Sequence, residues 1–272
     1  MNIFDIMGPI MMGPSSSHTA GAARIGYLTR KLLGSQPKRA ELLLHGSFAA
    51  TGAGHGTDRA LAAGLLGMRP DDARLPRSFE LAEAAGMELK LGKTVLRGAH
   101  PNTVLLKVED EAGKRLEVTA SSLGGGRVQV CAIDGLEARF TGELPTLIIR
   151  NQDRPGMVAE VTGVLSRRSV NIATMQLYRN TRGGLAVMVI ESDQPIWAAA
   201  VEELRACPGI ERVTYLNMTE GGGVTWPFPR WPACWRRPGT SPCGGRCWRT
   251  ICGTEGWTRP APGGRCPPCG RP

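Results

Sequence analysis

Hydroxyl side chains and one imidazole stand together near the start of the chain. The run is Ser15-Ser16-Ser17-His18-Thr19, and it follows Gly13-Pro14. Apolar residues then recur at helical spacing, which places the run at a predicted helix N-terminus: Ala22, Ile25, Leu28, Leu32 and Leu33. Unpaired backbone N–H groups and the positive end of the helix dipole favour an anion there. One serine would suffice as a cap, so the extra hydroxyls favour a carboxylate or phosphate site.

A second polar cluster, Thr51-Gly-Ala-Gly-His-Gly-Thr-Asp58, lies between a predicted strand and a predicted helix. Its glycines permit tight turns and close approach to a ligand, and Thr57 or Asp58 is suited to cap the helix. The cluster lacks the lysine of a P-loop and the full Rossmann fingerprint, so it gives little support to a nucleotide site. His55 stands between glycines on a predicted loop, which favours a functional role over a place in the core.

Two further motifs follow, and each alone is typical of a turn. They are His100-Pro101-Asn102-Thr103 and Ser122-Leu123-Gly124-Gly125-Gly126. The glycines of the second motif are suited to wrap a carboxylate with backbone amides. His45 falls on a predicted strand after apolar residues, and we expect it to pack in the sheet.

The elements that must position these motifs form a first α/β unit over residues 1–143. We predict helices near 19–33 and 57–67 and strands near 40–48, 103–109, 115–120 and 127–133. Residues 111–114 read as a hairpin turn, and residues 137–145 read as the link to the next unit.

Residues 145–218 read as a βαββαβ unit, which is a ferredoxin-like pattern. The predicted strands are 146–150, 170–178, 185–191 and 210–216, with a helix beginning after the Pro155-Gly156 turn and another around 196–204. The fold class is therefore α+β.

Residues 219–272 differ in kind, because Gly, Pro, Arg, Trp and Cys dominate them. They carry eight arginines and two acids, hence +6 of the net +9, which leaves +3 for the rest of the chain. The body therefore lacks the charge expected of a nucleic-acid binder, although the Arg/Trp tail keeps that function open as an alternative. Cys266 and Cys269 have CxxC spacing, but the tail cysteines are irregularly spaced. We interpret the tail as disordered and non-native, either out of frame or a fusion artefact, with the natural domain ending near 218–223.

Cysteine content and the length of apolar runs indicate the compartment of the protein. The body has two cysteines, Cys131 and Cys207, which fits a reducing environment. No signal peptide is apparent, and no apolar run approaches the ~20 residues that a membrane helix requires. We expect a cytoplasmic protein with no membrane partner.

Taken in order, the four motifs of the first unit resemble the β subunit of the iron–sulfur L-serine dehydratases. The matching segments are 13–19, 44–58, 100–103 and 122–126, and the 145–218 unit resembles the ACT domain that follows in that subunit. The resemblance spans about residues 1–218, and the tail has no counterpart in the family.

This resemblance implies deamination of L-serine to pyruvate and ammonia. A [4Fe–4S] cluster would act on the serine hydroxyl, with its cysteine ligands in a partner α subunit and no metal ligand in this chain. By motif match, His18 and His55 are the catalytic candidates, for orientation and electrostatics, and the general base stays open. The substrate-binding candidates are Ser16, Ser17, Thr19, Asn102 and Gly125.

The ACT resemblance implies an effector site at Asp153, Gly156, Met157 and Asn171. Such a site would bind an amino acid across an interface between ACT domains, in a homo- or hetero-oligomer. A purely structural dimerisation module is the alternative. At the level of the whole chain, a non-catalytic amino-acid sensor remains an alternative to a dehydratase subunit, because similar domain pairs regulate some 3-phosphoglycerate dehydrogenases.

Overall fold

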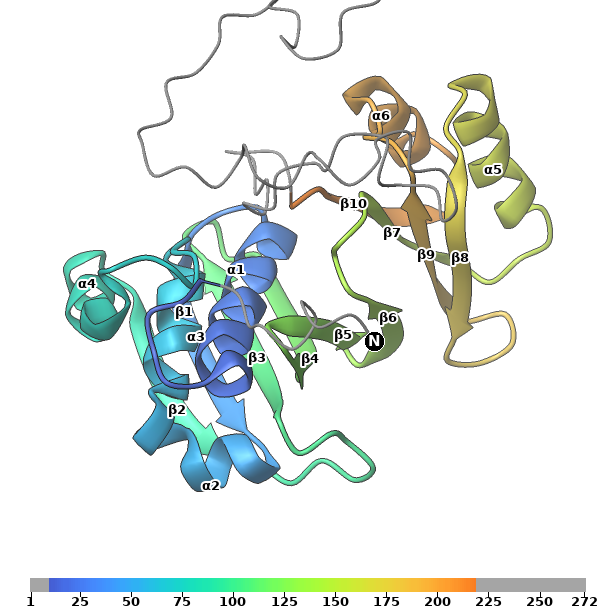
Figure 1. The fold of residues 1–272 in the computed structure, drawn as a ribbon. Coiled ribbons are helices and arrows are strands. Elements are labelled where there is room, and N and C mark those ends of the chain that lie inside the picture. The colour runs from blue at the N-terminus through green and yellow to red at the C-terminus, as the bar shows by residue number, and fades with distance from the viewer. Residues whose placement is uncertain (1–9, 219–272) are drawn as a thin grey trace, which may run out of the picture. The chain divides into compact units, whose positions relative to one another are not determined.

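The structure is a computed structural model, and it describes residues 10–218. Their first part forms a six-stranded sheet (Figure 1). The strands lie in the order β2-β1-β3-β4-β5-β6, in which β1 and β2 are parallel and the other neighbours are antiparallel. Their bounds are β1 Pro37–Leu44, β2 Glu88–Lys93, β3 Thr103–Asp110, β4 Arg115–Gly124, β5 Arg127–Ile133 and β6 Leu136–Phe140.

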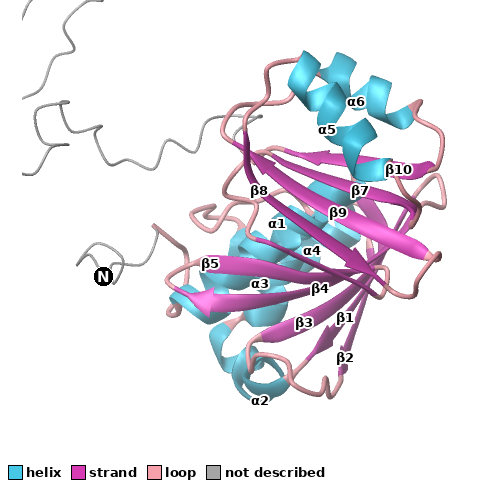
Figure 2. Cartoon of the chain, turned by 90° about the vertical axis from the view of Figure 1, so that its right-hand side faces the viewer, coloured by secondary structure: helices cyan, strands magenta, loops and turns pink. Residues whose placement is uncertain are grey.

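Helices pack on one face of this sheet (Figure 2). A π-helical turn, η2 (Ser16–Gly21), leads directly into α1 (Ala22–Leu33), and α2 (Gly46–His55) is followed at once by α3 (Thr57–Leu65). A short 3-10 turn, η3 (Leu75–Arg77), precedes α4 (Ser78–Ala84).

The helices α1 and α3 approach each other closely because glycines face one another across the contact. A Cβ on Gly26 would meet the backbone of Leu61 and Leu65, and a Cβ on Gly64 would meet the backbone of Ala23 and Tyr27. The apolar faces of both helices are buried against the sheet, in one core with Leu28, Leu61 and Leu106. This core fixes α1, and therefore fixes the polar turn that precedes it.

The second part is a four-stranded antiparallel sheet in the order β10-β7-β9-β8. Its elements are β7 Thr146–Gln152, α5 Met157–Arg167, β8 Ile172–Arg179, β9 Leu185–Ser192, α6 Ala198–Arg205 and β10 Ile210–Leu216. Leu147, Ile149 and Met188 face a core with the two helices. Ile148, Val189 and Leu216 belong instead to the core of the first sheet. This is the predicted βαββαβ arrangement, and the α+β fold class is confirmed.

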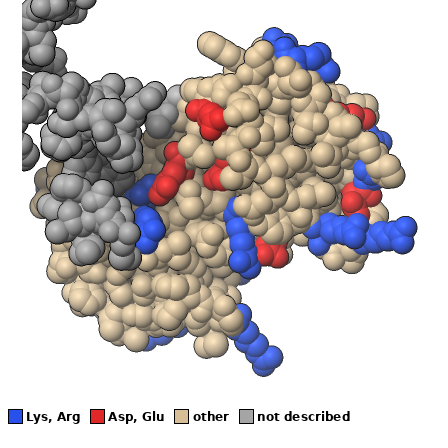
Figure 3. Space-filling view, turned by 45° about the vertical axis from the view of Figure 1, so that its right-hand side comes forward, with Lys and Arg blue, Asp and Glu red and all other residues tan. Residues whose placement is uncertain are grey.

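Charged side chains of both signs lie near one another on the face drawn in Figure 3. Several form exposed ion pairs, such as Arg167 with Glu203 at 2.7 Å and Lys38 with Glu111 at 3.4 Å. Exposed pairs of this kind contribute little to stability.

Two stretches of predicted secondary structure are wrong. Residues 51–55, predicted as a loop, are the second half of α2, and the preceding strand ends at Leu44 instead of continuing to 48. Residues 137–145, predicted as a link, contain most of β6, in which Ala138 and Phe140 are buried. The predicted features of residues 219–272 lie outside the described residues.

Candidate functional site

The polar run at the start of the chain forms a capped helix start, as predicted. Ser15 is the N-cap in an extended conformation, and its Oγ accepts a hydrogen bond from the backbone N–H of His18 at 3.1 Å. The carbonyl of Ser15 accepts from the N–H of both Thr19 and Ala20, which widens the first turn into a π-helix. Such turns are rare and occur often at functional sites. Ser16 and Ser17 are half-buried within this turn.

The imidazole of His18 lies at the centre of a hydroxyl cluster. Its Nδ1 is 3.1 Å from Ser17 Oγ, and its Nε2 is 3.1 Å from both Ser47 Oγ and Thr51 Oγ1. The ring packs in a T-shaped arrangement with the fully buried Phe48, with ring centroids 5.3 Å apart. Both ring nitrogens therefore have hydroxyl partners, and an aromatic side chain supports the ring.

His55 lies beside His18, with ring centroids 5.1 Å apart. The chain positions His55 through its backbone, because Thr19 Oγ1 donates a hydrogen bond to the His55 carbonyl at 3.0 Å. Thr19 is 1% exposed, so its end of this bond is buried. The structure thus brings together four of the predicted site residues, which are Ser17, His18, Thr19 and His55.

The α2 helix explains why two residues missing from the predicted site belong to it. Ser47, Thr51 and His55 are spaced by four residues, so a helix places them on one face. Had residues 46–55 been recognised as helical, this spacing would have identified Ser47 and Thr51 as partners of His55. Ser15, which caps the π-turn, was also missing from the predicted site.

Glycines with positive φ bound α2 at both ends. Gly46 has a φ of 54°, and a Cβ there would lie 2.6 Å from the Pro101 carbonyl oxygen. Gly56 has a φ of 66° and separates α2 from α3. Gly56 is the N-cap of α3, so the predicted side-chain cap by Thr57 or Asp58 is wrong.

The His100–Asn102 loop reaches the start of α2 through its backbone. The Ser47 N–H donates to the Pro101 carbonyl at 2.8 Å, and the Ser122 N–H donates to the Asn102 carbonyl at 2.9 Å. Asn102 is half-buried, and its N–H donates to His100 Nδ1 at 3.1 Å. The loop therefore stands next to the cluster, and a role for the Asn102 side chain stays a prediction.

The glycine motif is the tight turn between β4 and β5. Gly124, Gly125 and Gly126 all have positive φ, and the Gly126 carbonyl accepts from Arg24 Nη1 at 2.9 Å. Binding of a carboxylate by the backbone at Gly125 stays a prediction. The His45 ring, expected in the sheet, lies just after β1, where its Nδ1 accepts from the Leu96 N–H at 3.2 Å.

Two fully buried hydroxyls in these motifs have no hydrogen-bond partner within the described residues, Thr57 Oγ1 and Ser122 Oγ. Ser122 lies against Gly21 at the end of the π-turn, and Thr57 lies against Gly52 of α2. Both therefore adjoin the elements that carry His18 and His55.

The electrostatics favour a neutral His18. Burial lowers its pKa below the ordinary value of 6.5, and the neighbouring His55 lowers the pKa further, whereas the hydrogen bond with the Ser47 backbone acts in the opposite direction. At pH 7 the cluster therefore offers a neutral imidazole among hydroxyls at a helix start. Such a group is able to hold a carboxylate through the hydroxyls and to accept a proton on the ring.

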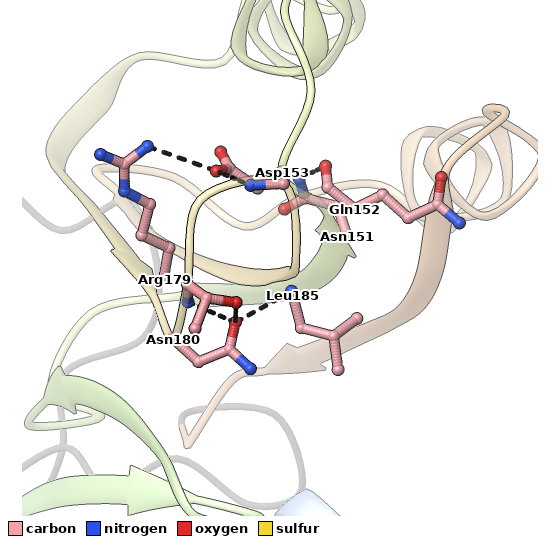
Figure 4. Close-up of polar contacts among 8 residues, drawn as sticks. Asn151, Gln152, Asp153, Arg179, Asn180 and Leu185 are labelled. Atoms are coloured by element: carbon pink, nitrogen blue, oxygen red, sulfur yellow. Dashed lines mark hydrogen bonds and ion pairs between the residues drawn. The ribbon is translucent and has the colours of Figure 1, made fainter.

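In the second sheet, the predicted effector loop is tied to a hairpin (Figure 4). Asp153 Oδ2 accepts from the Gly183 N–H at 3.0 Å and from Arg179 Nη1 at 3.3 Å. The Gly183 hydrogen bond, followed by Arg179, lowers the pKa of the Asp153 carboxyl below its ordinary value. Asn180 closes the same hairpin, because its Oδ1 accepts from the Leu185 N–H at 3.0 Å.

The remaining predicted effector residues do not gather at one point of this chain. Gly156 is the left-handed N-cap of α5, and Met157 is buried beneath it. Asn171 pairs with Asp193 just before β8 begins, whereas Arg179, the partner of Asp153, ends that strand. Asp153 and Asn171 therefore lie toward opposite ends of β8, and an effector site that uses both stays a prediction. Asn151, beside Asp153, has a buried Oδ1 with no hydrogen-bond partner among the described residues.

The described residues do not fit an iron–sulfur cluster. They contain two free cysteines, Cys131 and Cys207, and no group of three or more His, Cys, Asp or Glu side chains that would hold a metal. Within residues 10–218, none of the helices has the length and apolar character needed to cross a membrane.

Comparisons with known proteins match both parts of the chain. The serine dehydratase beta chain family matches residues 2–91, and the ACT domain family matches residues 145–209. The chain is 42% identical over 213 residues to the probable L-serine dehydratase beta chain of Bacillus subtilis, covering 78% of this chain and 96% of that protein. It is 38% identical to the L-serine dehydratase beta chain of Peptoniphilus asaccharolyticus, covering 80% of this chain and 97% of that protein.

A more distant similarity links the chain to another enzyme. The D-3-phosphoglycerate dehydrogenase of Methanocaldococcus jannaschii is 26% identical over 72% of this chain. That match covers 37% of the dehydrogenase.

Proposed function

Because the chain belongs to the family of L-serine dehydratase beta chains, we propose that it acts as the β subunit of an L-serine ammonia-lyase. The complex would convert L-serine to pyruvate and ammonia. The observation that carries this proposal is the pairing of His18 with His55, 5.1 Å apart, among hydroxyls at the start of a helix.

In this proposal the capped turn binds the carboxylate of serine. Ser16 and Ser17 present hydroxyls where the backbone N–H groups of the turn and the positive end of the helix dipole favour an anion. The Thr19 hydroxyl, predicted as a substrate contact, is buried and donates to the His55 carbonyl, so its part in this proposal is to hold His55 in place. Asn102 and Gly125 would contribute from the neighbouring loop and turn. The neutral ring of His18 and the ring of His55 then orient the substrate and handle a proton near its reacting carbon.

The cluster belongs to the partner in this proposal, because the described residues of this chain offer no set of cluster ligands. The α subunit would hold the [4Fe–4S] group, and this chain would supply binding, orientation and proton handling. The reaction would therefore need both subunits, and we expect cytoplasmic, oligomeric assembly through the ACT domain.

Reconstitution tests the proposal directly. The full chain is co-expressed without oxygen with an L-serine dehydratase α subunit, and pyruvate formation from L-serine is measured. We expect turnover by the complex and none by the chain alone. His18→Ala and His55→Ala are each expected to lower kcat on the order of 10²- to 10⁴-fold.

The matched control is Lys38→Ala, which removes an exposed side chain 54% accessible to water. It should leave kcat unchanged, and thermal unfolding should show all three variants folded. Near-wild-type turnover in the histidine variants would refute their role. Turnover by the chain alone would show that the cluster is assigned to the wrong subunit.

A non-catalytic amino-acid sensor is the second candidate. It is favoured by the similarity to a phosphoglycerate dehydrogenase and by the hydrogen bond that ties the Asp153 loop to the Gly183 hairpin. Calorimetry and the pyruvate assay together separate the two functions, because a sensor would bind L-serine with no α subunit and would add no activity to one.

A further inference from the structure

The hydroxyl of Thr51 makes two hydrogen bonds with one proton, which determines the protonation of its neighbour. Thr51 Oγ1 lies 3.0 Å from the Ser47 carbonyl oxygen and 3.1 Å from His18 Nε2. The carbonyl can only accept, so the Thr51 proton goes to it, as is common for threonine within a helix. Thr51 Oγ1 is then an acceptor toward His18, and Nε2 must carry a proton.

Ser47 is consistent with the same assignment. Its Oγ is also 3.1 Å from His18 Nε2 and 3.5 Å from Thr51 Oγ1. The oxygen shares the Nε2–H as a second acceptor, and its own proton remains available for another partner. Two hydroxyls spaced one helical turn apart therefore converge on one N–H group.

The other side of the ring follows from this assignment. A neutral imidazole with a proton on Nε2 has a lone pair on Nδ1. Ser17 Oγ, 3.1 Å away, must then donate its proton to Nδ1. Ser15 Oγ is 3.4 Å from Ser17 Oγ and accepts from the His18 backbone N–H. The hydrogen bonds thus run in one direction, from Ser15 through Ser17, His18 and Thr51 to the carbonyl of Ser47.

We propose that Thr51 is a positioning residue that fixes His18 in the Nε2–H tautomer, so that Nδ1, beside Ser17, is the ring atom that receives a proton. The inference deepens the proposed function, because the catalytic value of this tautomer rests on the role given there to His18. When Nδ1 takes one proton, the ring becomes a cation and keeps its Nε2–H bond to Thr51. The proton that leaves the substrate passes to Ser17 Oγ as the Ser17 hydroxyl proton passes to Nδ1, so Ser17 ends neutral, the ring carries the charge and no electron moves.

The tautomer is measured on the full chain without its partner. Nitrogen-15 NMR of histidine-labelled protein, at a pH above the titration of His18, distinguishes a protonated ring nitrogen from an unprotonated one. The chain has only four histidines, and His18→Ala assigns the signals. We expect a protonated Nε2 and an unprotonated Nδ1 in the wild type.

Thr51→Val and Thr51→Ser form the matched pair. Valine keeps the shape but removes the Thr51 acceptor, which leaves the Ser47 hydroxyl, able to donate as well as to accept, as the remaining partner of Nε2, so the Nδ1–H tautomer should gain population. Serine restores the acceptor and should restore the wild-type pattern. A wild type with Nδ1–H, or an unchanged pattern in Thr51→Val, overturns the inference. If the valine variant fails to fold, the wild-type spectrum still tests the tautomer, and Thr51→Ala, which also lacks the acceptor, tests the part played by Thr51.

Turnover of the reconstituted complex tests the consequence for catalysis. We expect Thr51→Val to lower kcat roughly tenfold or more, because an imidazole that already carries its proton on Nδ1 cannot accept another there. Thr51→Ser should remain near wild type. An altered tautomer with unchanged kcat overturns the positioning role. The tautomer result does not depend on whether the complex deaminates serine, so failure of the proposed function is seen separately.

Discussion

The hydroxyl of Thr19 donates a hydrogen bond to the backbone carbonyl of His55, 36 residues further along the chain, at 3.0 Å. This bond joins the π-turn that carries His18 to the last residue of α2. The two imidazoles are therefore held at their separation by a partly buried polar contact and by the packing around it. The relationship makes the geometry of the site dependent on a residue that need not touch a substrate.

Removing this bond should destabilise the chain and loosen the site. Thr19→Val keeps the volume but leaves the His55 carbonyl without its side-chain donor, which should lower the free energy of unfolding by about 1–2 kcal/mol. Urea unfolding of the full chain measures the change. In the reconstituted complex, the KM for serine should rise as well.

The matched control for Thr19 is Thr19→Ser, which retains the donor. It should lose less stability than the valine variant and should keep the lower KM. Equal losses in the two variants would show that the hydrogen bond contributes nothing and that only the methyl group matters.

The pH dependence of stability follows from the lowered pKa of His18. The folded chain binds this proton more weakly than the unfolded chain does, so stability rises with pH in the window between the two pKa values. The contribution is complete above about 6.5 and is lost as pH falls through the lower pKa of the folded state. An NMR titration of the His18 ring should give a midpoint below 6.5.

Substitution of His55 tests whether this residue contributes to the lowered pKa of His18. His55→Asn removes the neighbouring positive charge that forms on protonation, so the His18 midpoint should move up toward its ordinary value. His100→Asn changes a histidine that does not contribute to this shift and should leave the midpoint in place. A midpoint unaffected by His55→Asn would leave burial as the whole cause.

The contact between α1 and α3 makes a separate prediction about stability. Gly26→Ala would place a methyl group 3.0 Å from the Leu65 nitrogen and 3.1 Å from the Gly64 Cα, both in the backbone. Because a backbone moves less easily than a side chain, we expect a loss of about 1–3 kcal/mol in thermal or urea unfolding.

Gly163→Ala in α5 is the matched control, since the nearest atom there is the end of the flexible Arg167 side chain at 3.5 Å. Alanine is the better helix former by about 1 kcal/mol, so this variant should be neutral or slightly more stable. A loss as large as that of Gly26→Ala would contradict the role of the close helix contact.

Sequence patterns predicted most of the strands because alternation of apolar residues records which face is buried. The exceptions have physical causes. The α2 helix contains glycine at 46, 52 and 54, and each interior glycine lowers helix propensity by about 1 kcal/mol. Tertiary contacts override this preference, since Phe48 is fully buried and Gly52 packs against Thr57. No local pattern records such contacts.

The predicted site shows the same division. A helix start rich in hydroxyls was readable from residues 15–19 alone, because capping is local. The closeness of His18 and His55 was predicted from the family motifs. Ser47 and Thr51 were missed, because their contact with His18 depends on residues 46–55 forming a helix. The β6 strand, by contrast, did carry a readable alternation over Leu136–Phe140, with Ala138 and Phe140 inward. This strand was missed because residues 137–145, which end at Pro145, were interpreted as a link between the two units.

The left-handed glycines at the two ends of α2, Gly46 and Gly56, fix how this short helix is rotated about its own axis. Successive residues of a helix turn by about 100°, so one inserted residue between Gly46 and Gly56 would swing part of the polar stripe away from the His18 ring. A shift of this size leaves composition and helix content almost unchanged. Relatives of this chain should therefore tolerate exchanges at α2 positions other than Ser47, Thr51 and His55 far better than any change in the length of α2.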